Sequence, residues 1–199
     1  KKVDDGWIIQ GEKVWSTTAN TADYLLVIAQ TDKNPKKRSE GVSVFFVPKD
    51  SEGVTVVPLP KLGMRALCSC RITFDEVFVP NELLLGEEGQ VWKETTNTLN
   101  NERIMNAASC VGMLDGVLED ALEYMKIRKA FGRTIGEFQA LQHYIADISM
   151  WRKQAELMLY NSAWLQSQGL PCAIEAAMTK TVASEYACQA ADKGISILG

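Results

Sequence analysis

The hydrophobic pattern of this 199-residue chain changes abruptly after Pro80. Before this proline, apolar residues occur in short runs separated by turn-forming residues, as they do in the strands of antiparallel sheets. From about Glu88 onward they recur at steps of three, four or seven, which is the spacing of an amphipathic helix. The sequence therefore predicts an α+β protein, with a β-domain over residues 1–86 and a helical domain over residues 87–199.

The first half contains a series of short candidate strands. Two of them are predicted around a tight turn at Gly11-Glu12, and the polar stretch from Thr31 to Gly41 is predicted to be a loop. This spacing favours an antiparallel sandwich or barrel. No Gly-x-Gly-x-x-Gly sequence follows any of these runs, so a Rossmann nucleotide site is not supported. The candidate strands cover residues 7–10, 13–17, 24–29, 42–47, 54–57 and 71–79.

The second half predicts three long helices, over residues 88–126, 136–168 and 172–193. Gly169 and Pro171 separate the last two, because glycine commonly ends a helix and proline fits the first turn of the next one. The first helix would be roughly 60 Å long at 1.5 Å per residue. Three such helices make an incomplete antiparallel bundle, since bundles usually close with four. The helix that completes the bundle would come from chain outside this sequence or from another subunit.

Composition and charge exclude several classes of function. The chain is 46% apolar and 23% charged, as soluble globular proteins are, and its formal charge of −4 gives no reason to expect nucleic acid as a partner. Its longest apolar runs are far shorter than the ~20 residues that span a bilayer. Residues 1–5 include no Met and no apolar stretch, so we expect the sequence to be a fragment.

The cysteines and the single histidine argue against a metal site. The five cysteines contain no Cys-x-x-Cys pair, and thiolate zinc sites need such pairs. Reduced, mostly buried thiols in a cytosolic-type compartment are the simpler interpretation. His143 has no second histidine to act with, so we expect no metal site and no Ser–His triad.

Two adjacent charged residues within the first predicted helix are candidates for a site. Arg103 falls on the apolar stripe marked by Leu99 and Ala107, and a guanidinium there needs partners, because an unpaired buried charge is strongly destabilising. Glu102 lies on an adjoining face of small and partly polar residues. That face suits the lining of a cleft better than a core. The alternative is a glutamate on a solvated helix face.

Two aromatic segments are further candidates for a site. Arg128 precedes Phe131 in a cluster of four cations at a helix end, and a guanidinium is a natural phosphate ligand. Cations at that end also offset the helix dipole, which is a purely structural alternative. Trp15 and Thr17 would share one face of a strand, because strand side chains alternate. For Trp15 the alternative is a core tryptophan.

Taken together, these segments resemble the acyl-CoA dehydrogenase family. Each motif alone is weak, but together they are specific, and they keep the family's order and approximate spacing along the whole chain. The matching segments are Trp15-Ser16-Thr17 with Ala22-Asp23, Lys61 to Arg65, Phe74 to Pro80, Leu84 to Gly89, Asn101-Glu102-Arg103, Arg128 to Gly132, Phe138-Gln139, Ala146-Asp147, and Ile197 to Gly199.

This resemblance implies a fold and an activity. The chain would be much of a middle β-domain joined to the first helices of a C-terminal helical domain, in a homotetramer that holds FAD between subunits. Such enzymes oxidise an acyl-CoA to the trans-2-enoyl-CoA. A carboxylate removes the α-proton, the β-hydrogen leaves as hydride to flavin N5, and electrons pass to electron-transfer flavoprotein. The expected compartment is the cytoplasm, or the mitochondrial matrix in a eukaryote.

The resemblance also assigns roles to individual residues. Trp15 would pack beside the isoalloxazine, and Ser16 and Thr17 would complete that segment, with Thr17 near flavin N5. Arg128 and Gln139 would bind the FAD pyrophosphate and adenylate of the neighbouring subunit. The remaining residues so assigned are Phe131, which would pack at that cofactor site, and Asn100, Asn101 and Arg103, which would lie along the acyl-CoA site.

The catalytic base has two candidates within the family. Most members use a glutamate near the C-terminus, on a segment that would follow Gly199. A subset uses the helix position that Glu102 occupies here, and burial beside flavin and thioester would raise the pKa of such a carboxylate toward neutrality. We therefore assign Glu102 as the predicted base.

The sequence departs from the family pattern at two positions and leaves two other functions open. Ser196 stands where many members carry a glutamine that binds FAD, and Leu67 stands where many carry serine. One alternative is an acyl-CoA oxidase-like enzyme, which would pass its electrons to oxygen. The other is a non-catalytic assembly module of a larger flavoprotein.

Overall fold

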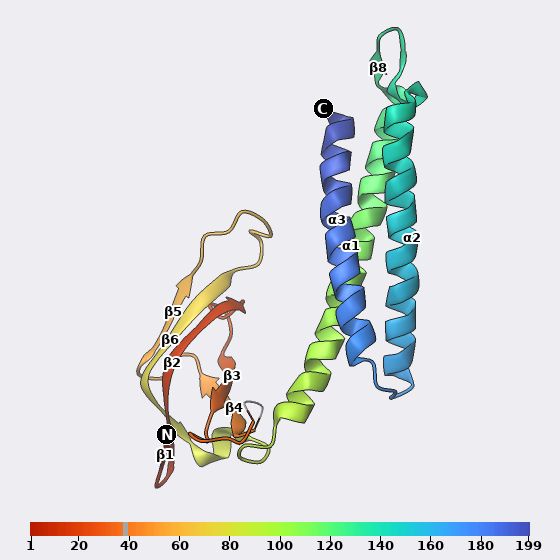
Figure 1. Cartoon of the computed structure of the whole chain (residues 1–199). Helices are drawn as coiled ribbons and strands as arrows, with labels where there is room; N and C mark the ends of the chain where they lie inside the picture. Colours follow the sequence, from red (N-terminus) through yellow and green to blue (C-terminus); the bar gives the residue numbers. More distant parts are fainter. Residues whose placement is uncertain (38–39) are drawn as a thin grey trace. The chain divides into compact units, whose positions relative to one another are not determined.

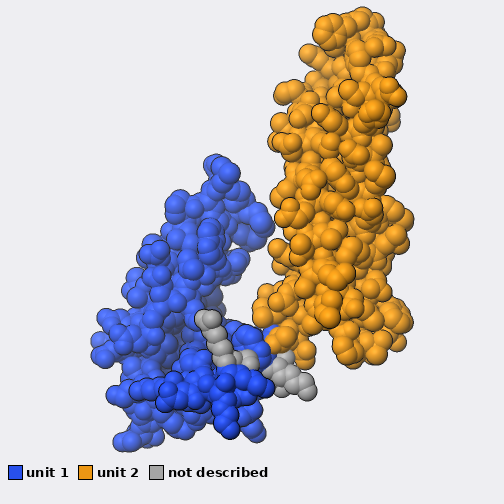
Figure 2. Space-filling model, in the orientation of Figure 1, with its two compact units in different colours: residues 1–95 blue, residues 96–199 orange. Residues whose placement is uncertain are grey.

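The computed structural model describes residues 1–37 and 40–199, without the side chains of residues 93 and 94. It divides into two compact units, Lys1–Thr95 and Thr96–Gly199 (Figure 2). The boundary predicted from the sequence, between residues 86 and 87, stays a proposal for where the domains meet. Positions 38 and 39, in the predicted loop from Thr31 to Gly41, lie outside the described residues.

The first unit contains two antiparallel sheets (Figure 1). One has the strand order β1-β2-β6-β5, formed by Lys2–Val3, Gly6–Thr17, Ser69–Pro80 and Val54–Pro58. The other has the order β3-β4-β7, formed by Tyr24–Gln30, Val42–Pro48 and Leu84–Leu85. A short 3₁₀ helix, Asn81–Leu83, precedes β7. The predicted antiparallel architecture is confirmed as two separate sheets, and the described strands do not close into a barrel.

The core of this unit consists of apolar side chains contributed by both sheets. Trp7 of β2 and Phe45 of β4 are each 1% exposed, and their rings meet edge to face at 5.5 Å between centroids. Val47 of β4 and Val77 of β6 are fully buried in the same cluster. Burying large aromatic rings is strongly favourable, so this pair anchors the contact between the sheets.

The predicted turn at Gly11-Glu12 is wrong. β2 continues through these residues and pairs with β6 on both sides of them, with irregular register between Ile9 and Gly11 and again between Lys13 and Ser16. Gly11 has φ +134, a value that L side chains rarely adopt. Gly11 therefore lies within one long strand, beside a bulge whose extra residue belongs to β6 between Phe74 and Val77, where the sequence indicated a hairpin.

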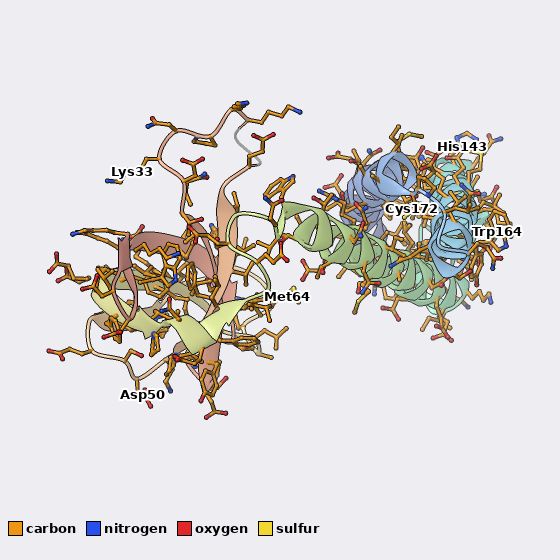
Figure 3. All side chains as sticks on the ribbon, turned by 90° about the horizontal axis from the view of Figure 1, so that it is seen from below. Lys33, Asp50, Met64, His143, Trp164 and Cys172 are labelled. Carbon is orange, nitrogen blue, oxygen red and sulfur yellow. The ribbon has the colours of Figure 1, made fainter. Side chains whose placement is uncertain are left out.

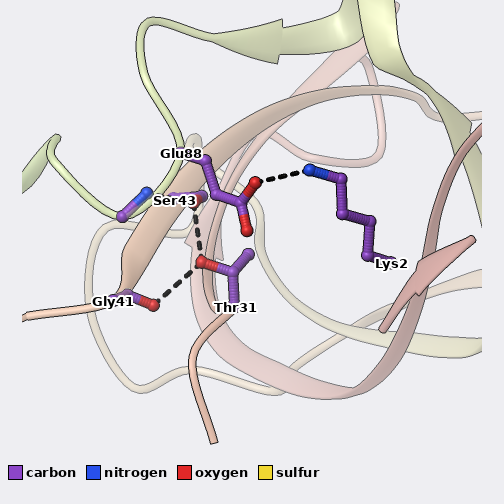
Figure 4. A network of polar contacts seen from close by, with 6 residues as sticks. Lys2, Thr31, Gly41, Ser43 and Glu88 are labelled. Carbon is purple, nitrogen blue, oxygen red and sulfur yellow. Dashed lines mark hydrogen bonds and ion pairs between the residues drawn. The ribbon is translucent and has the colours of Figure 1, made fainter.

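A polar network fixes the segment that follows β7 to the β-unit (Figure 4). The buried hydroxyl of Ser43 accepts a hydrogen bond of 2.9 Å from the backbone N–H of Gly89 and lies 2.8 Å from the hydroxyl of Thr31. Glu88 forms an ion pair of 2.7 Å with Lys2. The Ser43 bonds matter most, because a buried hydroxyl without partners would be destabilising.

The second unit contains three long helices that run side by side (Figure 1). They are α1 (Trp92–Ile127), α2 (Gln139–Ser167) and α3 (Ala173–Leu198). The three predicted helices are confirmed, with shifted ends. The first begins four residues later than expected, and the third continues to Leu198. Between α1 and α2, the predicted break is a small hairpin of β8 (Lys129–Ala130) and β9 (Arg133–Thr134), followed by the 3₁₀ helix Ile135–Glu137.

Small residues allow these helices to approach closely. Ala107 of α1, Ala155 of α2 and Ala183 of α3 are fully buried in one cluster with Leu114 and Ile148. A Cβ added at Gly194 would lie 2.8 Å from a methyl carbon of Val117. This alanine- and glycine-lined packing explains why the third helix is so rich in alanine. In the described part of the chain, no helix is both long and apolar enough to cross a membrane.

Candidate functional site

Trp15 is exposed and held in an unusual backbone conformation. Its φ is +64, it is 63% exposed, and it lies where the register of β2 against β6 shifts between Lys13 and Ser16. A non-glycine residue in this region is strained by about 1–3 kcal/mol, and such strain is concentrated at functional sites. The bulge also interrupts the regular alternation from which Trp15 and Thr17 were expected to share a face. Trp15 therefore does not lie in the core of this unit, whose buried tryptophan is Trp7.

Ser16 and Thr17 return to regular pairing after the bulge. They lie opposite Cys70 and Ser69 of β6, respectively. Ser16 is half-buried and Thr17 is exposed. The carbonyl of Thr17 accepts a hydrogen bond from the hydroxyl of Thr18, whereas the hydroxyl of Thr17 itself has no hydrogen-bond partner among the described residues. The segment thus presents an aromatic ring and an available hydroxyl together.

On α1, the predicted substrate residues differ in exposure. Asn100 is 7% exposed, and its amide oxygen accepts a hydrogen bond of 2.7 Å from the guanidinium of Arg103, which is half-buried. The expectation that Arg103 needs a partner is met in this way. Asn101 is exposed, and its amide oxygen accepts a bond of 3.3 Å from Gln166 of α2.

Glu102, the predicted base, lies on the exposed surface of α1. The residue is exposed, and its carboxylate makes no hydrogen bond or ion pair with the described residues. Its backbone carbonyl accepts a bond of 2.9 Å from Asn106. Within this unit the carboxylate is free to meet a ligand, and it is not committed to a structural ion pair. His143 is likewise exposed, on α2 (Figure 3).

The hairpin between α1 and α2 carries a second exposed aromatic residue. Phe131 and Gly132 form its two-residue loop with φ values of +53 and +82, as in the type I′ turn that suits right-twisted hairpins. Phe131 is 97% exposed, and its ring meets that of Phe138 edge to face at 6.2 Å. Arg128 is exposed beside this hairpin, and Gln139 is exposed at the first turn of α2. The guanidinium of Arg128 has no partner among the described residues.

A hydrogen-bonded pair fixes the segment between this hairpin and Gln139. The carboxylate of Glu137 accepts bonds of 2.8 Å from the hydroxyl of Thr134 and 3.0 Å from its backbone N–H. The hydroxyl bond is the larger cause, and together these bonds lower the pKa of Glu137. Because the folded pKa is lowered, the ionised carboxylate stabilises this segment at neutral pH, and that stabilisation is lost as the pH falls through the lowered pKa.

Replacing Thr134 by alanine should raise the pKa of Glu137 toward its ordinary value, because the hydroxyl bond is removed while the backbone bond remains. An NMR titration of the Glu137 carboxyl carbon measures this change. Thr181→Ala is the matched control, since the hydroxyl of Thr181 bonds only within α3. An unchanged titration midpoint in Thr134→Ala would show that the hydroxyl does not hold the carboxylate.

The two sets of exposed side chains offer different binding chemistry. Trp15, with the available hydroxyl of Thr17, offers an aromatic face and a hydrogen-bonding group for a flat heteroaromatic ring. Arg128 offers a forked cation for a pyrophosphate, beside an exposed aromatic residue at Phe131. No sequence signal indicated the strained backbone at Trp15 or Phe131. Among the described residues, no group of three or more His, Cys, Asp or Glu side chains could hold a metal ion.

Comparisons with known proteins bear on both units. The sequence matches the acyl-CoA dehydrogenase middle domain over residues 1–77 and the acyl-CoA dehydrogenase C-terminal domain over residues 89–199. It is 38% identical over 199 residues to the short/branched chain specific acyl-CoA dehydrogenase, mitochondrial, of Bos taurus, of which it covers 46%.

Two solved structures are similar to the whole chain. Butyryl-CoA dehydrogenase from Megasphaera elsdenii has a TM-score of 0.92 and 33% identity, with 52% of that chain covered. An FAD complex of PigA has a TM-score of 0.93 and 33% identity, with 51% of that chain covered. The chain thus spans about half the length of the relatives it matches. The resemblance seen in its motifs is confirmed, and the chain belongs to the acyl-CoA dehydrogenase family.

Proposed function

We propose that the full-length protein containing this chain oxidises an acyl-CoA to the trans-2-enoyl-CoA with FAD as its cofactor. Family membership over both units carries this proposal, since the chain matches the middle and the C-terminal domain models in the family's order. The exposed, uncommitted side chains on each unit support it. FAD, when bound, would supply the hydride acceptor for the β-hydrogen of the substrate.

On this proposal, Trp15, Ser16 and Thr17 bind and orient the flavin ring. The strained conformation of Trp15 supports the assignment, because an exposed indole in such a backbone is not explained by packing. The hydroxyl of Thr17 would donate a hydrogen bond to the flavin ring or accept one from it. Excluding water from the ring would be a second effect of the indole, since it covers an apolar face.

The helical unit would contribute the catalytic carboxylate. Glu102 would remove the α-proton of the acyl-CoA, holding it on one carboxylate oxygen. The position of the neighbouring Arg103 is fixed by its bond to the buried Asn100. Together with Asn101, these residues would line the substrate site on α1. The pair of Asn100 and Arg103 would keep the helix surface rigid next to the base, because the guanidinium of Arg103 satisfies the amide oxygen of the buried Asn100.

Arg128, Phe131 and Gln139 would bind the pyrophosphate and adenylate of FAD from a second subunit. We therefore propose a homo-oligomer, a dimer or a tetramer, with electron-transfer flavoprotein as the acceptor of electrons. The protein would act in the mitochondrial matrix if its source is a eukaryote, in line with the mitochondrial name of the Bos taurus relative. It would otherwise act in the cytoplasm.

Arg128→Ala in the full-length protein should weaken FAD binding by about tenfold to a hundredfold, because a charge-assisted bond of about 1.5–3 kcal/mol is lost. Titration of the apoprotein with FAD measures this loss. Lys129→Ala is the control, since Lys129 is an exposed cation at the adjacent position. An equal loss of FAD affinity in both variants would indicate that positive charge in general attracts the cofactor. It would contradict a specific role for Arg128.

Product analysis tests the proposed reaction itself. An acyl-CoA should return as a thioester about 2 Da lighter, because two hydrogens leave the substrate. The product should form with an artificial electron acceptor, and air should support it only slowly. Fast peroxide formation in air would instead identify the oxidase-like alternative. A substrate that returns unchanged under both conditions, from protein carrying FAD, would overturn the proposal.

A further inference from the structure

Two cysteines that the proposed reaction does not use lie against each other at the start of β6. The sulfurs of Cys68 and Cys70 are 3.6 Å apart, within reach of a weak hydrogen bond between thiols. Cys70 is fully buried, and Cys68 is half-buried. The sulfur of Cys70 has one further polar neighbour, the amide oxygen of Asn20, at 3.8 Å.

A cation lies beside this pair. The ammonium group of Lys61 donates a hydrogen bond of 3.1 Å to the hydroxyl of Ser69, the residue between the two cysteines. It also donates to the backbone carbonyl of Leu67, the residue that precedes Cys68. The positive charge favours the thiolate form of Cys68, whereas the hydrogen bond with Cys70 and burial favour the thiol and raise the pKa of Cys68 above its ordinary value.

The backbone permits a bond between the two sulfurs. Residues two apart in a strand have Cα atoms about 6.6 Å apart, which is within the upper part of the range for disulfides. Their side chains also lie next to each other, since their sulfurs are 3.6 Å apart. Cys68 directly precedes β6, and its backbone carbonyl accepts a hydrogen bond of 2.7 Å from the N–H of Thr18. Closing the bond would bring the sulfurs from 3.6 Å to about 2.0 Å apart, through a change in the torsion angles of Cys68.

We propose that Cys68 and Cys70 form a redox-active dithiol that closes to a disulfide by exchange with a small-molecule disulfide such as oxidised glutathione. The thiolate of Cys68, the more accessible of the two, attacks one sulfur of the small disulfide and releases one glutathione thiolate. Cys70 then attacks the sulfur of Cys68 and releases the second glutathione. Two thiol protons pass to the departing thiolates, and two electrons pass from the cysteines to the glutathione disulfide.

Peptide mass spectrometry of the full-length protein tests this proposal. Trypsin cleaves after Arg65 and Arg71, so both cysteines fall in the peptide 66–71, which contains no other cysteine. The protein is incubated with rising ratios of oxidised to reduced glutathione at about pH 8.5, where an ordinary thiol is half ionised, and then alkylated. The exposed Cys188 of α3 falls in the peptide 181–193 and is an internal reference.

We expect peptide 66–71 to become about 2 Da lighter and to resist alkylation, because the two thiols have lost their hydrogens. Cys188 should instead gain a glutathione adduct. Cys70→Ser should trap the intermediate as a stable adduct on Cys68, and Cys68→Ser should react least, since the remaining Cys70 is buried. If wild-type peptide 66–71 shows only two alkylated thiols or a stable adduct at ratios that fully modify Cys188, the pair is not a redox-active dithiol.

Discussion

Replacing Glu102 by glutamine in the full-length protein should lower turnover by about a hundredfold to ten-thousandfold while leaving FAD bound. A carboxamide has nearly the same size as the carboxylate but cannot accept the α-proton, and general bases contribute about 10² to 10⁴ in rate. Steady-state turnover and flavin absorbance per chain measure the two effects separately. The exposed position of Glu102, without an ion-pair partner among the described residues, means that the substitution should not disturb folding.

Glu119→Gln is the matched control for this prediction. Glu119 is also exposed on α1, so the change removes the same charge from the same helix. We expect nearly normal turnover in this variant. Normal turnover in Glu102→Gln would remove Glu102 from the mechanism and would favour the family's other position for the base, in chain that would follow Gly199.

Leu114→Ala should destabilise the helical unit by about 2–5 kcal/mol, the range measured for truncating buried leucines. Leu114 is fully buried, and its cluster includes residues of all three helices, so the cavity would lie at their centre. Urea unfolding followed by helical ellipticity measures the loss.

Met113→Ala is the control for this second prediction, because Met113 is adjacent on α1 but 53% exposed. It should shift stability by no more than about 0.5 kcal/mol. Similar losses in both variants would contradict the assignment of Leu114 to the core that joins the helices.

The helices could be predicted from the sequence because their cores repeat at helical spacing. Ala107, Leu114 and Ala121, which are spaced seven residues apart in the sequence, are all buried. Trp92 and Leu99, near the start of this helix, are 43% and 37% exposed, and the helix begins at Trp92, four residues later than predicted. The spacing of apolar residues indicates which face of a helix is apolar. It does not indicate at which residue the packing against the neighbouring helices ends.

The strands were less predictable because a glycine can lie either in a turn or in an irregular part of a strand. Gly11 looked like the centre of a turn, and a positive φ is compatible with either a turn or a bulge. Only the pairing of residues on both sides with β6 decides between them. That pairing is a long-range contact, which local sequence does not encode.

The candidate site was named by resemblance, and its residues remain proposals, but the structure adds a physical reason for two of them. Trp15 and Phe131 both combine high exposure with a positive φ. Neither property follows from local sequence, since strand tryptophans are usually buried. The contact between Cys68 and Cys70 was equally hidden, because metal and redox motifs are sought as Cys-x-x-Cys, while a strand brings residues two apart onto one face.

The visible spectrum of the purified full-length protein under anaerobic conditions, before and after one equivalent of an acyl-CoA, tests the central claim most directly. We expect a flavin absorbance band at about 450 nm whose intensity falls when the thioester is added, because the substrate reduces the flavin. A colourless protein that takes up no added FAD would contradict the claim. So would a flavin band that every acyl-CoA leaves unchanged.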